Sequence, residues 1–244
     1  MVEPYEDLRL AIEAGDLEAT ARLLNAGLEI SAENFRNATI KKDYDILKLL
    51  LSKGFNINTD INDSVPSALV YAIKDRVLAS WFLDHGADPN KRCRLRHCTP
   101  LSYAVREGSF DVIRLLFEGG GEIQQGQLLH YAAMRTESDS DSTQVLSFIY
   151  DQDPDFNKSR LDKLLDEDTP EFFMNQRSGV CTPLHYAAMS GSVDMVCFLK
   201  DKGAVSRKDP YNRTPLSYAI RNGHHDKIVP ILGSMVGSRL PGSI

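Results

Sequence analysis

The sequence has few cysteines, no leader-like start and no long apolar run. Only four of its 244 residues are cysteine, too few for a dense disulfide framework, so we interpret them as reduced thiols. The opening stretch, MVEPYEDLRL, carries acids where a signal peptide needs basic and then apolar residues. No apolar run reaches the length of a membrane span. We therefore expect an intracellular protein, cytoplasmic, nuclear or both, without a membrane partner.

An excess of positive charge is also missing. The chain has 28 lysines and arginines against 34 acids, a net charge of −6. This balance disfavours sequence-independent binding to the phosphates of nucleic acid. The acidity is local, because residues 137–172 alone carry a net charge of −8, with 11 acids and 3 bases. A basic stretch at residues 91–97, KRCRLRH, keeps a nuclear or nucleic-acid adaptor open as an alternative function.

Catalytic and cofactor motifs are absent. The sequence contains no G-x-S-x-G, no H-E-x-x-H, no phosphate-binding G-x-x-x-x-G-K-[ST] and no dinucleotide fingerprint. Cys93, His97 and Cys98 lie close together, but a zinc site needs four ligands at recognised spacing and no second pair is near. We expect no enzyme, no cofactor and no metal. The alternative from a different class is an unrecognised enzyme whose chemistry uses the long insert described below.

What the chain does contain is a repeated frame. In VCTPLHYAAMSGS, Thr182 can cap a helix, Pro183 fits its first position and Gly191 can end it in a left-handed conformation. The same frame recurs at Thr99 and Thr214, and weaker copies start near residues 6, 33, 67 and 127. A second helical run follows each frame. Each of these runs carries an adjacent apolar pair, such as Leu115 and Leu116, and we expect both members of each pair to be core residues.

The frame resembles the ankyrin repeat, whose signature is T-P-L-H-x-A at a period of about 33 residues. The resemblance spans nearly the whole chain. It implies an all-α solenoid of stacked helix-turn-helix pairs with short β-hairpin fingers, forming a single domain over residues 1–244. It also implies that His130 and His185, at the fourth frame position, hydrogen-bond the backbone of a neighbouring turn rather than act in catalysis.

Two regions depart from the pattern. The fifth repeat has an acidic ESDSDS between its helices and an insert at about residues 158–172, in which we expect Leu161, Leu164 and Leu165 to share one helical face. We hypothesise that this acidic segment regulates access to the binding groove, against the alternative of a solvated loop. The last repeat places Pro230 inside a helix and has few charges, so its outer face could support self-association.

The resemblance also suggests where a partner binds. In this family the recognition surface is the concave side, built from finger tips and from the exposed positions just before the glycine that ends each inner helix. We predict a non-catalytic adaptor or scaffold that binds another protein, one with an acidic segment, through the groove of the third to seventh repeats. Carried over by frame, the predicted positions are Leu95, Arg96, Arg106, Glu107, Met134, Arg135, Met189, Ser190, Tyr211, Arg213, Arg221 and Asn222. Five are arginines, a residue type enriched at binding hot spots.

The architecture is testable in solution. Seven stacked helix pairs without a sheet should give a far-ultraviolet circular dichroism spectrum dominated by helix. A spectrum dominated by strand would contradict the repeat assignment.

Overall fold

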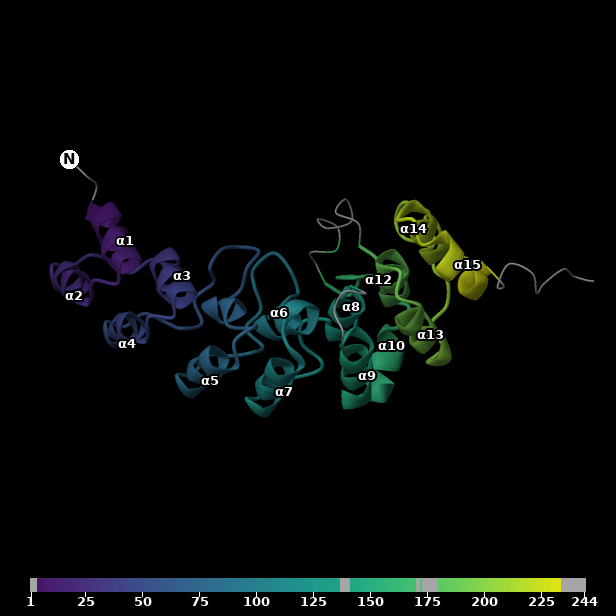
Figure 1. The fold of residues 1–244 in the computed structure, drawn as a ribbon, viewed down its shortest axis with the longest axis horizontal. Helices are drawn as coiled ribbons and strands as arrows, with labels where there is room; N and C mark the ends of the chain where they lie inside the picture. The colour runs from purple at the N-terminus through teal and green to yellow at the C-terminus, as the bar shows by residue number, and fades with distance from the viewer. Residues whose placement is uncertain (1–3, 137–140, 170–171, 173–179, 234–244) are drawn as a thin grey trace, which may run out of the picture. The chain divides into compact units, whose positions relative to one another are not determined.

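The computed structural model describes residues 4–136, 141–169, 172 and 180–233 (Figure 1). Its packing divides the chain into two compact units, residues 1–122 and 123–244, and the single domain over residues 1–244 stays a prediction. Parts of two sequence-based hypotheses lie outside the described residues: the acidic stretch at 137–140, and the segment after residue 233 that belongs to the expected self-association surface.

Unit 1 contains four helix pairs. Figure 1 shows their first members in one row and their second members in another. Within the first row, α1 packs on α3, α3 on the 3-10 helix η1, and η1 on α6. The first members are α1 (Pro4–Ala14), α3 (Ala32–Lys41), η1 (Ala68–Tyr71) and α6 (Pro100–Glu107). Their partners are α2 (Leu17–Asn25), α4 (Tyr44–Ser52), α5 (Arg76–Asp84) and α7 (Phe110–Glu118).

The described residues of unit 2 form three further pairs and one additional helix of several residues. The first members are α8 (Leu128–Ala133), α12 (Pro183–Ser190) and α14 (Pro215–Arg221), and α12 packs on both of the others. Their partners are α9 (Ser142–Gln152), α13 (Val193–Asp201) and α15 (His225–Leu232), with Pro230 inside α15 as expected. The additional helix, α10 (Pro154–Arg160), packs against α9. The all-α solenoid predicted from the sequence is therefore confirmed.

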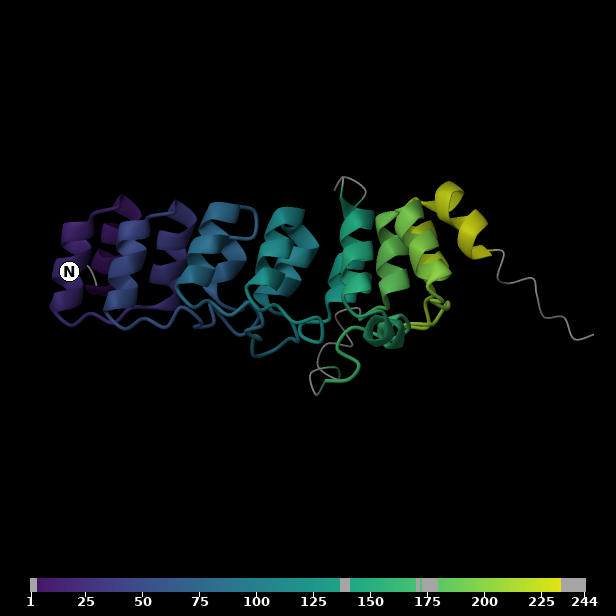
Figure 2. The same cartoon turned by 90° about the horizontal axis from the view of Figure 1, so that it is seen from below.

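The connections between pairs form the fingers, which gather along one edge of unit 1 in Figure 2. The sequence led us to expect short β-hairpins there. Across the described residues the β-type pairing is one isolated antiparallel bridge between Asn62 and Val65, and the rest of the fingers consist of turns and extended chain.

The caps predicted from the repeated frame are present. The Thr182 hydroxyl accepts a hydrogen bond from the His185 backbone N–H, and Pro183 opens α12. Gly191 ends the helix with φ of 79°, in the left-handed region that favours glycine. A Cβ added there would lie 2.5 Å from Nδ1 of His224, so the next repeat also requires the small residue. Sequence and packing thus fix both ends of this helix.

Stacking buries the apolar face of every pair. Leu184, Ala187 and Ala188 of α12 are all fully buried, and the two alanines let the neighbouring helices approach closely. The adjacent apolar pairs of the second helices are less buried than we expected. One member of each is buried and the other is half-buried, as with Leu116 and Leu115, because successive residues point to different sides of a helix.

The insert differs from the expectation in its helical part. Helix α10 ends at Arg160, and residues 161–165 form a turn and extended chain rather than a helix, so the expected helical face does not exist. Leu161 and Leu164 are nevertheless buried. The buried side chain of Asn157 explains the end of α9, because its amide donates to the carbonyl oxygens of Ile149 and Tyr150 at 2.9 and 3.1 Å.

Leu184→Asp tests the stacking. The substitution would place an unpaired charge at a fully buried position, and we expect it to destabilise unit 2 by about 3 kcal/mol or more in urea unfolding. Val205→Asp, at an exposed position of the same unit, is the control and should change stability by about 0.5 kcal/mol or less. Equal midpoints for Leu184→Asp and the parent chain would mean that Leu184 does not stabilise the stack.

Candidate protein-binding surfaces

Asparagines hold successive fingers of unit 1 in register. The Asn58 side chain donates to the carbonyl of Gly86 at 3.0 Å and accepts from the N–H of Asp88 at 2.8 Å. Asn90 repeats both bonds one repeat later, to Gly120 at 2.8 Å and Glu122 at 2.9 Å. Neither asparagine was predicted from the sequence. A sequence signal for both exists, because each stands four positions after a glycine that ends a helix.

The finger that contains the basic stretch is tied to the finger before it. The Leu95 N–H donates to the carbonyl of Asp63 at 2.8 Å. Lys91 pairs with Asp60 at 2.9 Å and Arg94 pairs with Asp63 at 3.4 Å. Part of the positive charge therefore faces carboxylates of the same chain. Leu95 and Arg96 are exposed, as the sequence predicted for a finger tip.

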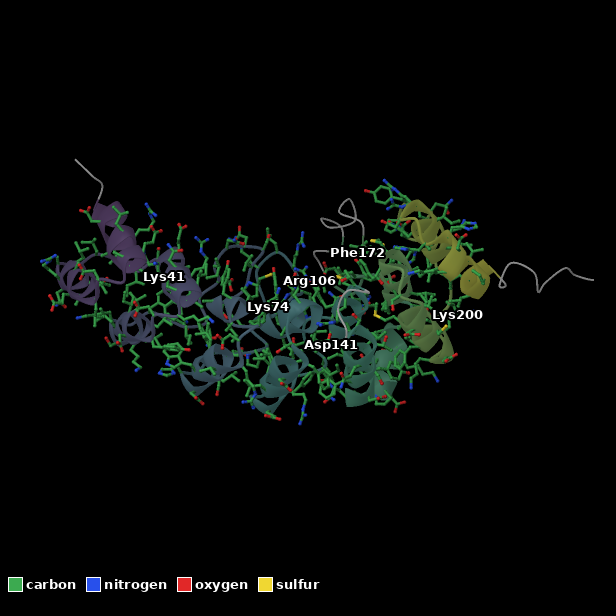
Figure 3. All side chains as sticks on the ribbon, in the orientation of Figure 1. Lys41, Lys74, Arg106, Asp141, Phe172 and Lys200 are labelled. Carbon is green, nitrogen blue, oxygen red and sulfur yellow. The ribbon has the colours of Figure 1, made fainter. Side chains whose placement is uncertain are left out.

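The first-helix row of unit 1 presents apolar and cationic side chains together. Arg106 lies with its guanidinium carbon 5.3 Å from the centre of the Tyr103 ring and forms an ion pair with the exposed Glu107. The sequence analysis missed two neighbours in this row, the exposed Ile40 of α3 and Tyr71 of η1. Figure 3 labels three basic residues from successive repeats: Lys41 in α3, Arg106 in α6, and Lys74 in the turn between η1 and α5.

In unit 2 an arginine lies between two tyrosine rings. The guanidinium carbon of Arg213 is 4.6 Å from the ring centre of Tyr211 and 4.7 Å from that of Tyr218. Tyr211 is 50% exposed, whereas Tyr218 is buried. The cation is thus held between an outer and an inner aromatic ring.

Buried Asp209 organises this stack. Its carboxylate pairs with Arg213 at 2.8 Å, and it accepts hydrogen bonds from the Tyr218 hydroxyl and from the N–H groups of Tyr211 and Arg213. Burial favours the neutral acid, but the bonds from Arg213 and Tyr218 outweigh it and lower the pKa of Asp209. The carboxylate therefore stays charged and fixes the finger.

The other predicted positions of unit 2 differ in exposure. Arg221 and Asn222 are exposed, and Met134, Met189 and Ser190 are half-buried. Arg135 corrects the sequence analysis, which took it as an exposed position. It is only 4% exposed and pairs with Asp141 at 2.5 Å. Its guanidinium therefore serves the packing of the fifth repeat and is not offered to a partner.

Both histidines of the frame bond the backbone of a neighbouring turn, as predicted. His185 Nε2 lies 3.1 Å from the carbonyl oxygen of Arg213, and its Nδ1 lies 2.8 Å from the Thr182 hydroxyl. His130 Nε2 lies 2.8 Å from the carbonyl oxygen of Lys163, which belongs to the insert. Burial lowers the pKa of both rings, for His130 to about 4. Each histidine is therefore neutral near pH 7.

Additional bonds dock the insert onto unit 2. Arg207 forms two hydrogen bonds to the Glu167 carboxylate, at 2.6 and 2.7 Å. Gln127, at the start of α8, donates to the Asp166 carboxylate at 2.6 Å and accepts from the Asp166 N–H at 2.8 Å. These contacts hold residues 161–169 against the rest of unit 2, and regulation of the groove by the acidic segment stays a prediction. Residues 161–169 take the place of a finger in the fifth repeat.

Among the residues that the structure describes, no group of three or more histidine, cysteine or acidic side chains could hold a metal ion. Within the same residues, no helix combines the length and apolar character needed to cross a membrane.

Comparisons with known proteins agree with this architecture. A family model described as "Ankyrin repeats (3 copies)" matches residues 35–127 and again residues 129–238. The crystal structure of the human ASB11 ankyrin repeat domain superposes with a TM-score of 0.58 at 18% identity, covering 96% of this chain and 99% of that one. At this identity the likeness concerns the fold alone.

Curated relatives cover part of the chain. "Ankyrin repeat, SAM and basic leucine zipper domain-containing protein 1" from Ornithorhynchus anatinus is 31% identical over 126 residues, 47% of this chain and 26% of the relative. The Mus musculus protein of the same name is 27% identical over 123 residues, 46% of this chain and 26% of the relative. The match thus spans about a quarter of the length of these relatives.

The buried His130 predicts a pH-dependent stability. A histidine whose folded pKa is depressed stabilises the fold above its unfolded pKa of about 6.5 and loses that contribution as the pH falls towards its folded pKa. With a folded pKa of about 4, His130 should cost unit 2 about 2 kcal/mol between pH 7 and pH 5.

Urea unfolding at both pH values measures this loss. His130→Gln should lose less stability than the parent chain over the same interval, and His225→Gln, at an exposed position, should behave like the parent. An identical loss in His130→Gln and in the parent would contradict a neutral, buried His130.

Proposed function

The chain belongs to the ankyrin repeat family, whose repeats are generally protein–protein interaction modules, and from that premise we propose that it is a non-catalytic adaptor that binds a protein partner. The proposal assigns binding to finger tips and to exposed positions of the first helices. Each unit contributes its own surface. In unit 1 it consists of Leu95, Arg96 and Arg106, and in unit 2 of Tyr211, Arg213 and Arg221.

The observation that carries the proposal is the Tyr211–Arg213–Tyr218 stack. Tyrosine and arginine dominate interface hot spots because they offer a large contact area together with directional hydrogen bonds. The Asp209 contacts hold Arg213 and the backbone of Tyr211 in place before a partner arrives. Preorganisation of this kind reduces the entropy lost on binding. An exposed tyrosine over a fixed cation is therefore the strongest candidate anchor in unit 2.

The proposed partner carries an acidic segment with apolar side chains. In unit 1, exposed Ile40, Tyr71 and Leu95 offer apolar contacts, and Arg96, together with the basic residues of the first-helix row, offers positive charge. Complementary charge increases the association rate and favours the correct partner. The chain as a whole is acidic, so these local basic positions are the ones that suit an acidic ligand.

The two alternatives receive less support. A nucleic-acid interface on residues 91–97 would need free cations, but Lys91 and Arg94 face Asp60 and Asp63. An active site on the insert would need available carboxylates, but Glu167 pairs with Arg207, and Asp168 pairs with Arg160 and Lys163. Lys91 and Arg94 in the basic stretch, and Glu167 and Asp168 in the insert, therefore already have partners within the fold.

Tyr211→Ala tests the proposed anchor. We expect the variant to lose at least about tenfold in affinity for partners captured from the native cell, because hot-spot truncations cost about 2 kcal/mol. Val205→Ala is the matched control, since Val205 is also 50% exposed in unit 2, and it should keep the parent affinity.

Capture by the parent chain followed by mass spectrometry identifies the partners, and a direct titration then compares the three proteins. Circular dichroism checks that both variants retain the helical fold. Equal affinity of Tyr211→Ala and the parent for every captured protein would contradict the assignment of the stack as an anchor.

A further inference from the structure

The finger between α5 and α6 closes around two cysteines. The Cys93 N–H donates to the carbonyl of Cys98 at 3.2 Å, which brings the two backbones together. Their sulfur atoms are 3.2 Å apart, and the Cys93 thiol also lies 3.3 Å from the carbonyl oxygen of Arg96. A disulfide needs a sulfur–sulfur distance of about 2.05 Å. A small side-chain movement would therefore join the pair without refolding the finger.

Hydrogen bonds at the pair favour a thiolate, the ionised sulfur that acts as the nucleophile. The hydrogen bond from the Cys98 thiol lowers the pKa of Cys93, against an opposing effect of burial. Among the charged groups nearby, Asp60 opposes ionisation, but its carboxylate pairs with Lys91.

Access to the pair is restricted. Cys93 is 2% exposed and Cys98 is 1% exposed, so a bulky disulfide reagent would need a large opening of the finger, and a small oxidant such as hydrogen peroxide would need a much smaller one. Burial alone does not create this reactivity. Cys181, in unit 2, is buried as well, and there burial raises the pKa of the thiol to about 11. Such a thiol is a poor nucleophile near neutral pH.

We propose that Cys93 and Cys98 form a dithiol site that hydrogen peroxide oxidises to an intramolecular disulfide. The Cys93 thiolate attacks one peroxide oxygen, the O–O bond breaks, and the released hydroxide takes up the proton that Cys93 lost. Cys93 is then a sulfenic acid. The Cys98 sulfur attacks the Cys93 sulfur, and the departing hydroxide leaves as water with the Cys98 thiol proton. Two thiols are oxidised and one peroxide is reduced to two waters.

The bond would fix the finger that presents Leu95 and Arg96. Oxidation removes the thiol proton that Cys93 can donate to the Arg96 carbonyl, so the tip changes its internal bonding while its ends are locked together. The site itself does not depend on the proposed binding function, because its chemistry is contained within residues 93–98.

Peroxide treatment of the folded full-length chain tests the site. After brief exposure near neutral pH, catalase removes the peroxide, and N-ethylmaleimide labels the remaining thiols under denaturing conditions. We expect the mass of one disulfide and two labelled cysteines in the parent chain. A Cys181→Ser/Cys197→Ser variant, altered only in unit 2, should form the same disulfide and retain no labelled cysteine. Dithiothreitol should restore all the thiols.

Cys98→Ser separates the two steps. In that variant Cys93 should stop at the sulfenic acid, which dimedone traps, and the chain should form no intramolecular disulfide. We expect oxidation of the pair in the parent to be at least about tenfold faster than oxidation of Cys197. The cysteine nearest to Cys197 in the sequence is Cys181, in the preceding helix-capping segment. Two labelled thiols at Cys93 and Cys98 in the treated parent, or oxidation of Cys197 before the pair, would overturn the proposal.

Discussion

Short helices that cannot hold their own shape set the main constraint on this protein. The longest helices among the described residues have 11 residues, below the length at which an isolated helix is stable in water. Each pair therefore depends on its neighbours for burial of its apolar face and for part of its backbone hydrogen bonding. Asn58 and Asn90 supply such bonds in unit 1, and His130 and His185 supply them in unit 2. Stability then resides at the boundaries between repeats.

The insert follows the same rule. In a fold where a loop is ordered by what it packs against, an added segment must find partners on its own repeat or the next one. Residues 161–169 find them in Gln127 and His130 of the fifth repeat and in Arg207 of the sixth. The acidic side chains of this segment are thus mostly paired within unit 2. The aromatic and basic residues of the fingers are therefore the better candidates for binding a partner.

Local signals in the sequence predicted the repeated frame, its caps and the role of its histidines, because these depend on residues only a few positions apart. Features set by longer-range packing were not predicted. The sequence shows that the third repeat is two residues shorter between its helices, but the shortening of its first helix to the 3-10 helix η1 was not predicted. Leu161–Leu165 has helical spacing, but the docking contacts hold it in another conformation. Its place in the repeat predicts that Arg135 is exposed, but Arg135 is buried and pairs with Asp141. The repeated frame does not include Asp141, which stands at the start of α9.

Native-state hydrogen exchange tests this account most directly. The N–H groups of Asp88 and Glu122 lie in loops, and each donates to a side chain of an adjacent repeat. If bonds between repeats maintain the fold, these amides should exchange within about tenfold of the rate of buried helical amides in their own unit. Exchange at the rate of an unprotected loop would contradict the account, because the fingers would then be ordered independently of the repeats beside them.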